Sequence, residues 1–246
     1  MESRRALARQ RRARPASKRL ALAVAAGCLL ALPAMAQKAS LERGPHKLEI
    51  VLERRNTSGW ERIDPGLVLK QNDRVRFRAT ANFDGYLYVM NQGTSGDYSR
   101  LFPREDTGQN NEIRAGKEYL VPATEGVFRI TGPAGHEIVY WMISPAELGA
   151  RPEYAPLPPP PDLQTLPPHL LPRCDDTIFR ARGDCVDTSA GPRAVNDESQ
   201  LPQNLAQVPK ASGSELLFVQ KEGSSVVSAP PALEGPVIFE FRLAHN

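Results

Sequence analysis

The residues whose spacing points most directly to binding chemistry are Arg74, Arg76 and Arg78. Apolar residues alternate with them, which is typical of a β-strand, and successive side chains of a strand point to opposite faces. The three guanidinium groups therefore share one face, where they can bind an anionic polymer or an acidic protein through charge-assisted hydrogen bonds. The alternative is a solvated face on which these arginines pair with neighbouring carboxylates such as Glu49 and Glu53.

The sequence contains no recognisable catalytic constellation. Its four histidines lie far apart, and His136-Glu137 lacks the second histidine, four residues on, that the zinc-protease helix motif requires. No Gly-x-Ser-x-Gly elbow and no phosphate-binding glycine loop occur. We therefore expect a non-catalytic protein without a cofactor. The alternative is a hydrolase assembled from separate loops, which would join a base, a nucleophile and an acid in a concave pocket.

Two short motifs suggest other ligands and are better explained without them. The loop 105–112 offers carboxylate and amide oxygens for calcium, but it lacks the alternate-residue spacing of an EF-hand. We expect a solvated loop there and no metal site. Arg182-Gly183-Asp184 spells a cell-adhesion tripeptide, and a match of three residues is frequent by chance.

Residues 1–36 have the three parts of a secretory leader. Eight basic residues and one acid occupy its first 19 positions, and an apolar run extends from Leu20 to Leu32. Pro33 ends that run, and Ala34-Met35-Ala36 supplies the small-x-small pattern that a signal peptidase recognises. We expect cleavage after Ala36, which makes Gln37 the first residue of a periplasmic or secreted protein.

Cys28 provides an alternative location. Ala25-Ala26-Gly27-Cys28 resembles the box in which a lipoprotein is cleaved before a lipidated cysteine. Ala replaces the usual Leu three residues before this cysteine, and the apolar run continues beyond it, so release after Ala36 is favoured. The membrane is a partner only if Cys28 is lipidated.

Loss of the leader changes both charge and cysteine content. The whole chain has 31 basic and 28 acidic residues; without the leader's eight bases and one acid, 23 and 27 remain, a net charge of −4. Nucleic-acid binding needs a basic face, so we expect no nucleic-acid partner. Cys174 and Cys185 are the two cysteines that remain. In an oxidising compartment this pair favours a disulfide, worth roughly 3 kcal/mol, over free thiols or a metal.

Residues 46–148 have the pattern of a β protein. Leu48, Ile50 and Leu52 alternate with Glu49, Val51 and Glu53. The stretches 85–90 and 138–143 are apolar on both sides, as central strands covered on both faces are. Turn sequences separate these stretches, and helical periodicity is nearly absent. The pattern predicts an all-β fold, an immunoglobulin-like β-sandwich over 46–148.

The chain after the sandwich changes composition twice. Nine prolines occur from Pro152 to Pro172, so 149–173 is predicted to be an extended connector, either a spacer or a strap on the domain. Residues 174–213 are polar, and we expect an irregular segment containing the disulfide. Strand alternation returns in 214–246, which is too short for its own core. These C-terminal strands should dock on the sandwich and complete it, which makes 149–213 an insertion.

The stretch from about 74 to 145 resembles a known bacterial module. The features that carry the resemblance are, in order, Asn72–Phe77, Asp84–Val89, Leu101-Phe102-Pro103, Ile113–Gly116 and Val121-Pro122 before Phe128. The module is the domain-of-unknown-function family 4384. The resemblance implies a β-sandwich in an envelope protein, and it carries over no catalytic residue because the family has no established activity.

The leader, the sandwich pattern and the missing catalytic motif together indicate a class of function. We expect an exported envelope module that binds a protein or polymer partner in the periplasm. Arg74, Arg76 and Arg78 are its candidate binding residues, and Cys174 and Cys185 form its disulfide.

Overall fold

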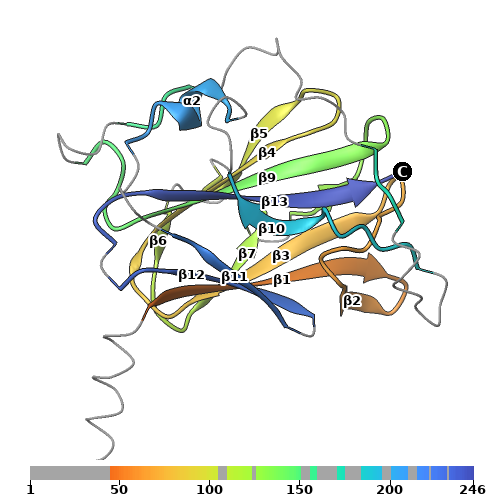
Figure 1. The fold of residues 1–246 in the computed structure, drawn as a ribbon, viewed down its shortest axis with the longest axis horizontal. Helices are drawn as coiled ribbons and strands as arrows, with labels where there is room; N and C mark the ends of the chain where they lie inside the picture. The colour runs from red at the N-terminus through yellow and green to blue at the C-terminus, as the bar shows by residue number, and fades with distance from the viewer. Residues whose placement is uncertain are drawn as a thin grey trace, which may run out of the picture. The chain divides into compact units, whose positions relative to one another are not determined.

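The fold is that of a computed structural model. It describes residues 45–104, 110–123, 126–150, 156–159, 171–174, 184–195, 201–209, 215–221, 223–231 and 233–246. Two antiparallel sheets pack face to face in these residues, which confirms the predicted all-β sandwich (Figure 1).

The first sheet has seven strands in the described part of the chain. They are β1 (His46–Asn56), β2 (Gly59–Arg62), β3 (Arg74–Ala81), β7 (Glu118–Val121), β8 (Phe128–Arg129), β11 (Leu217–Lys221) and β12 (Ser224–Ala229). Their order is β11-β12-β1-β3-β7, with β2 paired to β1 and β8 to β3. In β3, Val75, Phe77 and Ala79 are buried and alternate with the outer arginines, as predicted.

The second sheet has six strands in the same residues. They are β4 (Gly85–Gln92), β5 (Tyr98–Phe102), β6 (Glu112–Ile113), β9 (Gly135–Ser144), β10 (Gly191–Ala194) and β13 (Val237–His245). Their order is β10-β13-β9-β4-β5, with β6 paired to β4. Every residue of β9 is buried, which confirms the prediction of a central strand covered on both faces.

The C-terminal strands add to both sheets, as the sequence predicts. The hairpin β11–β12 joins the first sheet through pairing of β12 with β1. β13 joins the second sheet between β9 and β10. Because β12 pairs with β1 and β13 pairs with β9, both of which come earlier in the chain, 214–246 is part of the same folding unit.

The core lies between the inner faces of the two sheets. Phe77 contacts Trp141 and Phe241 edge-on, with ring centroids 5.4 and 5.1 Å apart. Trp141 and Phe239 stack with their centroids 6.2 Å apart. All four rings are fully buried, so they combine a large apolar area with the ring geometries that aromatic pairs prefer.

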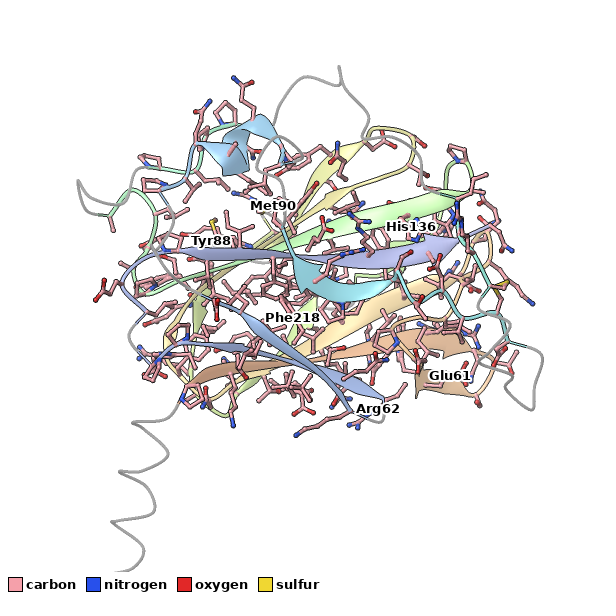
Figure 2. The ribbon with its side chains drawn as sticks, viewed as in Figure 1. Glu61, Arg62, Tyr88, Met90, His136 and Phe218 are labelled. Atoms are coloured by element: carbon pink, nitrogen blue, oxygen red, sulfur yellow. A yellow bond between two sulfur atoms is a disulfide. The ribbon has the colours of Figure 1, made fainter. Side chains whose placement is uncertain are left out.

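A second apolar cluster covers the outer face of the second sheet. Met90 and Tyr140 on that face pack against Leu205, which belongs to α2 (Gln203–Ala206), and Leu157 of the Pro-rich stretch packs against the same cluster (Figures 1 and 2). The described parts of the insertion therefore lie on the sandwich as a strap. They also contain two short elements, β10 and α2, that the sequence did not predict.

Several sequence predictions concern residues outside the described ones. These are the leader with its cleavage after Ala36, Cys28, the loop residues 105–109 and the Arg182-Gly183 part of the adhesion tripeptide. Within the described ranges, no helix has the length and apolar character that crossing a membrane requires.

Candidate functional site

The predicted arginine row lies on the outer face of β3, where carboxylates neutralise two of its members. Arg76 Nε donates to Glu53 Oε2 at 2.7 Å, and Arg78 Nη1 donates to Glu53 Oε1 at 3.3 Å. Arg78 also forms an ion pair with Glu118, and their hydrogen bond raises the pKa of Arg78 above its ordinary value. Arg74 is exposed at the start of the strand.

Trp60 of β2 completes the surroundings of this row. The Arg76 guanidinium lies 4.1 Å from the centroid of the Trp60 ring, and the Arg55 guanidinium lies 5.8 Å from it. Arg76 is thus held by a carboxylate and by a cation–π contact. The pairing with Glu53 matches the carboxylate pairing named above as the alternative, although Glu53 is buried and not solvated. A binding role for the row stays a prediction.

A buried polar cluster joins His136 of β9 to two residues of the insertion. His136 Nε2 lies 3.3 Å from Asp187 Oδ2 and 3.3 Å from Ser189 Oγ. The Ser189 hydroxyl donates to Asp187 Oδ1 at 2.6 Å. A base, a hydroxyl and an acid are therefore adjacent, which the sequence did not reveal because 53 positions separate Ser189 from His136.

The geometry of this cluster differs from that of a catalytic triad. In a Ser-His-Asp triad the acid and the hydroxyl contact opposite nitrogens of the imidazole, so that the ring can take the hydroxyl proton. Here Asp187 and Ser189 both contact Nε2 of His136. The Ser189 hydroxyl donates to the carboxylate directly, so this arrangement does not activate it as a nucleophile.

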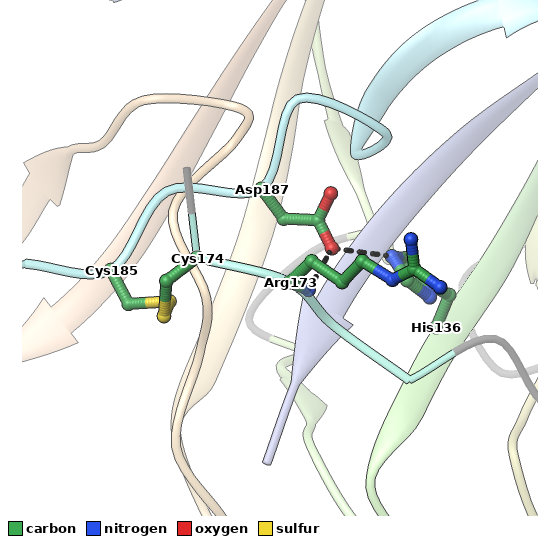
Figure 3. Close-up of a disulfide and its surroundings, with 5 residues drawn as sticks. All are labelled: His136, Arg173, Cys174, Cys185 and Asp187. Carbon is green, nitrogen blue, oxygen red and sulfur yellow. Dashed lines mark hydrogen bonds and ion pairs between the residues drawn. A yellow bond between two sulfur atoms is a disulfide. The ribbon is translucent and has the colours of Figure 1, made fainter. Parts of the chain in front are cut away.

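The cluster fastens the disulfide segment to the sandwich (Figure 3). The backbone N–H of Arg173 donates to Asp187 Oδ2 at 2.9 Å, and the Cys174–Cys185 disulfide follows directly, as predicted. Burial alone would raise the pKa of Asp187. Hydrogen bonds from Ser189 and from the backbone N–H of Arg173 outweigh that effect and leave this pKa below its ordinary value.

The same segment is also tied to the loop between β2 and β3. The Val68 N–H donates to the Cys185 carbonyl at 2.9 Å, and the Asp187 N–H donates to the Gly66 carbonyl at 2.8 Å. A Cβ atom at Gly66 would lie 2.9 Å from Val186 Cγ1, so any larger residue here would force Val186 to shift. The disulfide, Asp187 and this loop together hold the insertion against both sheets.

A second polar cluster is buried on the inner face of β9. His245 Nε2 lies 3.5 Å from Glu137 Oε1 and 3.4 Å from Thr94 Oγ1. Asn91 Nδ2 donates to Glu137 Oε2 at 3.2 Å. Each of the four side chains belongs to a buried residue, and His245 has no exposed surface. Burial of this degree suits a structural role in holding the end of β13 against β4 and β9.

A cavity lies between the sheets at the start of β1. Its lining includes His46, Phe83, Leu216 and Val237. Its volume is about 10 Å³, which holds no more than one water molecule. This cavity is therefore too small for a substrate or cofactor.

The surface that suits a partner is the free edge of β11. In the described residues, β11 ends the first sheet and pairs on one side only, with β12. Phe218 packs on the core, with its ring centroid 6.0 Å from that of Phe239 (Figure 2). Leu217 and Val219 point to the outer face and are 65% and 51% exposed. An apolar edge strand of this kind is a template for strand addition.

Sequence reasoning predicted strands in 214–246 and missed this edge. Leu216–Val219 is apolar on both sides, which is the pattern of a strand covered on both faces. The structure covers only the face that carries Leu216 and Phe218. The outer residue Val219 is exposed, whereas its register partner Val226 on β12 is buried. The apolar run could have indicated an exposed apolar face, because it contains more apolar residues than one buried face needs.

Comparison with known proteins identifies one part of the chain. Residues 68–147 match the family Domain of unknown function (DUF4384). This confirms the resemblance predicted for residues 74–145. No curated protein and no solved structure matches the chain.

The DUF4384 segment supplies strands β3 to β9, which is part of each sheet. β1, β2 and the strands from β10 onward lie outside it and complete the sandwich. Within the segment, Gly85 begins β4, where a Cβ atom would lie 3.0 Å from the Ser144 carbonyl oxygen. Tyr88 packs on the outer cluster, and its hydroxyl accepts the Leu148 N–H at 2.9 Å. Both residues therefore have structural tasks.

Proposed function

We propose that this protein is an exported, non-catalytic module of the bacterial envelope that binds a protein partner at the β11 edge. The observation that carries the proposal is the exposure of Leu217 and Val219, 65% and 51%, on a strand that ends its sheet in the described residues. An extended partner segment would add main-chain hydrogen bonds to β11. Its side chains would cover this apolar pair, which gains about 25 cal/mol per Å² of apolar surface buried.

A protein partner fits the surface of this chain better than an anionic polymer does. A polymer bound at the arginine row would have to displace the ion pairs that Glu53 makes with Arg76 and Arg78. Displacing internal partners offsets the gain from new charge-assisted contacts. The β11 edge needs no such exchange, because its apolar residues already face solvent.

The non-catalytic part of the proposal is supported by the His136 cluster. Asp187 and Ser189 contact the same ring nitrogen, so the cluster lacks the geometry of nucleophilic catalysis. A hydrolase is the rival function and would depend on the Ser189 hydroxyl. The rival predicts that Ser189→Ala abolishes hydrolysis of ester or peptide substrates, whereas the proposal predicts no such activity in either protein.

Export is supported by the leader pattern in 1–36 and by the disulfide, since disulfides persist in oxidising compartments. Mass analysis of the protein from a periplasmic fraction should find Gln37 at its N-terminus. Recovery from the membrane with a diacylated Cys28 would contradict soluble release and make the protein a lipoprotein.

Site-specific photo-cross-linking tests the binding surface. A benzophenone side chain at Leu217 should give one identified envelope protein as its adduct in living cells, and Val219→Lys should remove that adduct. Ser99 is the matched control, because it lies exposed on β5, the edge strand of the other sheet. Equal adducts from Leu217 and Ser99, or none from Leu217, would contradict the proposal.

A further inference from the structure

We infer that β11 pairs with β11 of a second copy of this chain, antiparallel and about a two-fold axis at Phe218. The inference rests on the proposed function, because it names the partner of the edge described there. It makes the protein a symmetric dimer whose two first sheets join into one continuous sheet. In such an isologous interface the same patch must be complementary to itself.

The outer row of β11 has this self-complementarity. Along the strand, the row consists of Glu215, Leu217, Val219 and Lys221, in the order acid, apolar, apolar, base. All four are exposed. An antiparallel copy centred on Phe218 places Glu215 opposite the copy's Lys221 and Leu217 opposite the copy's Val219. Each pair occurs twice, and both kinds of pair stabilise neighbouring strands.

The two charged ends of this row are available for such pairs. Glu215 and Lys221 have no ion-pair partner within the described residues. Shifting the copy by two residues in either direction would set Glu215 opposite Val219 or Lys221 opposite Leu217. Charge complementarity therefore selects the axis at Phe218 as well as the antiparallel direction.

The backbone of β11 agrees with the same axis. In an antiparallel pair, residues alternate between those that exchange hydrogen bonds with the neighbouring strand and those whose N–H and C=O point away. Two residues separate Lys221 from its partner Ser224, and a two-residue hairpin closes on a hydrogen-bonded pair. Lys221, Val219 and Leu217 thus bond to β12, and Phe218 directs its N–H and C=O outward, where a copy's Phe218 can meet them.

The other three sheet ends carry features that protect edges, whereas β11 carries one such feature, Lys221 at its end. β10 contains Pro192, which lacks an N–H. β5 carries Arg100, and its pairing with β4 shifts register between Val89 and Met90. β7 carries Glu118 in an ion pair. Charges, prolines and irregularities of this kind discourage edge pairing. Among these four sheet ends, β11 is therefore the one best suited to a second copy.

The anchoring of Phe218 makes the edge ready for pairing. Its ring contacts that of Phe239 with centroids 6.0 Å apart, and Leu216 packs on the same core. The strand is thus ordered before association, so a dimer loses little further conformational freedom.

Sedimentation equilibrium with the purified full-length chain tests the dimer. The wild type should sediment as a dimer at micromolar concentration, and Val219→Lys should raise the dimer Kd at least tenfold. Ser99→Lys, on the β5 edge, is the matched control and should leave the Kd unchanged. A monomeric wild type, or equal effects of the two substitutions, would overturn the inference.

Charge reversal tests the pairing of Glu215 with Lys221. Glu215→Lys alone places like charges opposite each other twice and should raise the Kd about tenfold. The double variant Glu215→Lys/Lys221→Glu restores opposite charges and should return the Kd close to the wild-type value. Failure of the double variant to recover would overturn the predicted register.

Disulfide trapping gives an independent measure of the register. In a Cys28→Ser background, chains with Leu217→Cys and differently tagged chains with Val219→Cys should form a mixed disulfide under mild oxidation. The predicted pair is non-hydrogen-bonded, with Cα atoms about 4.5 Å apart, which suits a disulfide. Rapid linking of Val219→Cys chains to one another would overturn the axis at Phe218.

The outcomes separate this inference from the proposed function. A wild type that stays monomeric while Leu217 still cross-links one different envelope protein would refute the second copy and support the binding module. Loss of both the dimer and every Leu217 adduct would refute both.

Discussion

The outer faces of the two sheets differ although both sheets bury their inner faces in one core. On the second sheet, Met90 and Tyr140 lie under Leu205 of α2 and under part of the Pro-rich stretch. On the first sheet, Leu217 and Val219 remain largely exposed at β11. Both faces carry apolar residues, so composition alone does not distinguish them.

The difference lies in what the insertion covers. Its described parts lie on the second sheet, where Asp187 contacts His136 of β9 and β10 pairs with β13. No described part of it packs on the outer residues of β11. An apolar face sealed by a distant segment is structural, whereas one left open is available to a partner.

The largest effect on stability is expected from removing the C-terminal strands, which belong to both sheets. Deletion of 214–246 takes away β11, β12 and β13 and with them Phe239 and Phe241, which are fully buried. We expect the remaining chain to lose its cooperative thermal unfolding transition, measured by circular dichroism. Retention of a wild-type melting temperature would show that the C-terminal strands fold separately from 46–148.

Paired substitutions compare the sealed and the open face directly. Leu205→Ala should lower the free energy of unfolding by about 3 kcal/mol, because Leu205 has no exposed surface. Leu217→Ala is the matched control on the open face and should change the free energy of unfolding by no more than about 0.5 kcal/mol. Urea unfolding of both variants measures the difference. Similar losses of unfolding free energy in the two variants would mean that the outer faces of the two sheets are equally covered.

The fastening of the insertion should depend on pH through Asp187. Its folded pKa lies below the ordinary value of about 4, so its stabilising contribution is complete at neutral pH and is lost as pH falls through the folded pKa. Asp187→Asn should cost about 2 kcal/mol at pH 7. The gap between wild type and variant should narrow at pH 3. An unchanged gap in urea unfolding at the two pH values would contradict this role.

The smallest effect is expected on the charged part of the open sheet. Arg78→Ala removes ion pairs with Glu53 and the half-exposed Glu118, and should cost no more than about 1 kcal/mol. Arg74→Ala, at an exposed position of the same row, is the control and should be neutral. Thermal unfolding at low and high salt checks both, because salt should shrink the Arg78 effect. A larger loss of stability for Arg74→Ala than for Arg78→Ala would contradict the pairing of Arg78 with Glu53 and Glu118.

The strands were predictable where one short-range pattern decided them. Alternation in β3 and double-sided apolar runs in β4 and β9 predicted strands of the observed kind. The pairing of Arg76 with Glu53 was foreseeable as an alternative, since both strands were recognised. The contact between His136 and Ser189 was not foreseeable, because it depends on the path of an insertion that has little periodicity.

The β11 edge shows the same limit of prediction from sequence. The apolar residues Leu216–Val219 predicted a strand, but a double-sided apolar pattern also describes strands buried on both faces. Its place at the end of a sheet follows from the pairing of β12 with β1, a contact between distant parts of the chain.

By itself, the sequence determined the β-sandwich class, the disulfide pair, the docking of the C-terminal strands and the likeness to DUF4384, because these depend on local periodicity, cysteine number and ordered motifs. Only the tertiary structure decided which apolar face is sealed and which is open. The physical reason is that exposure depends on which distant segment packs on a residue. Val219 and Met90 are both apolar residues on outer faces, and only Met90 lies beneath the insertion.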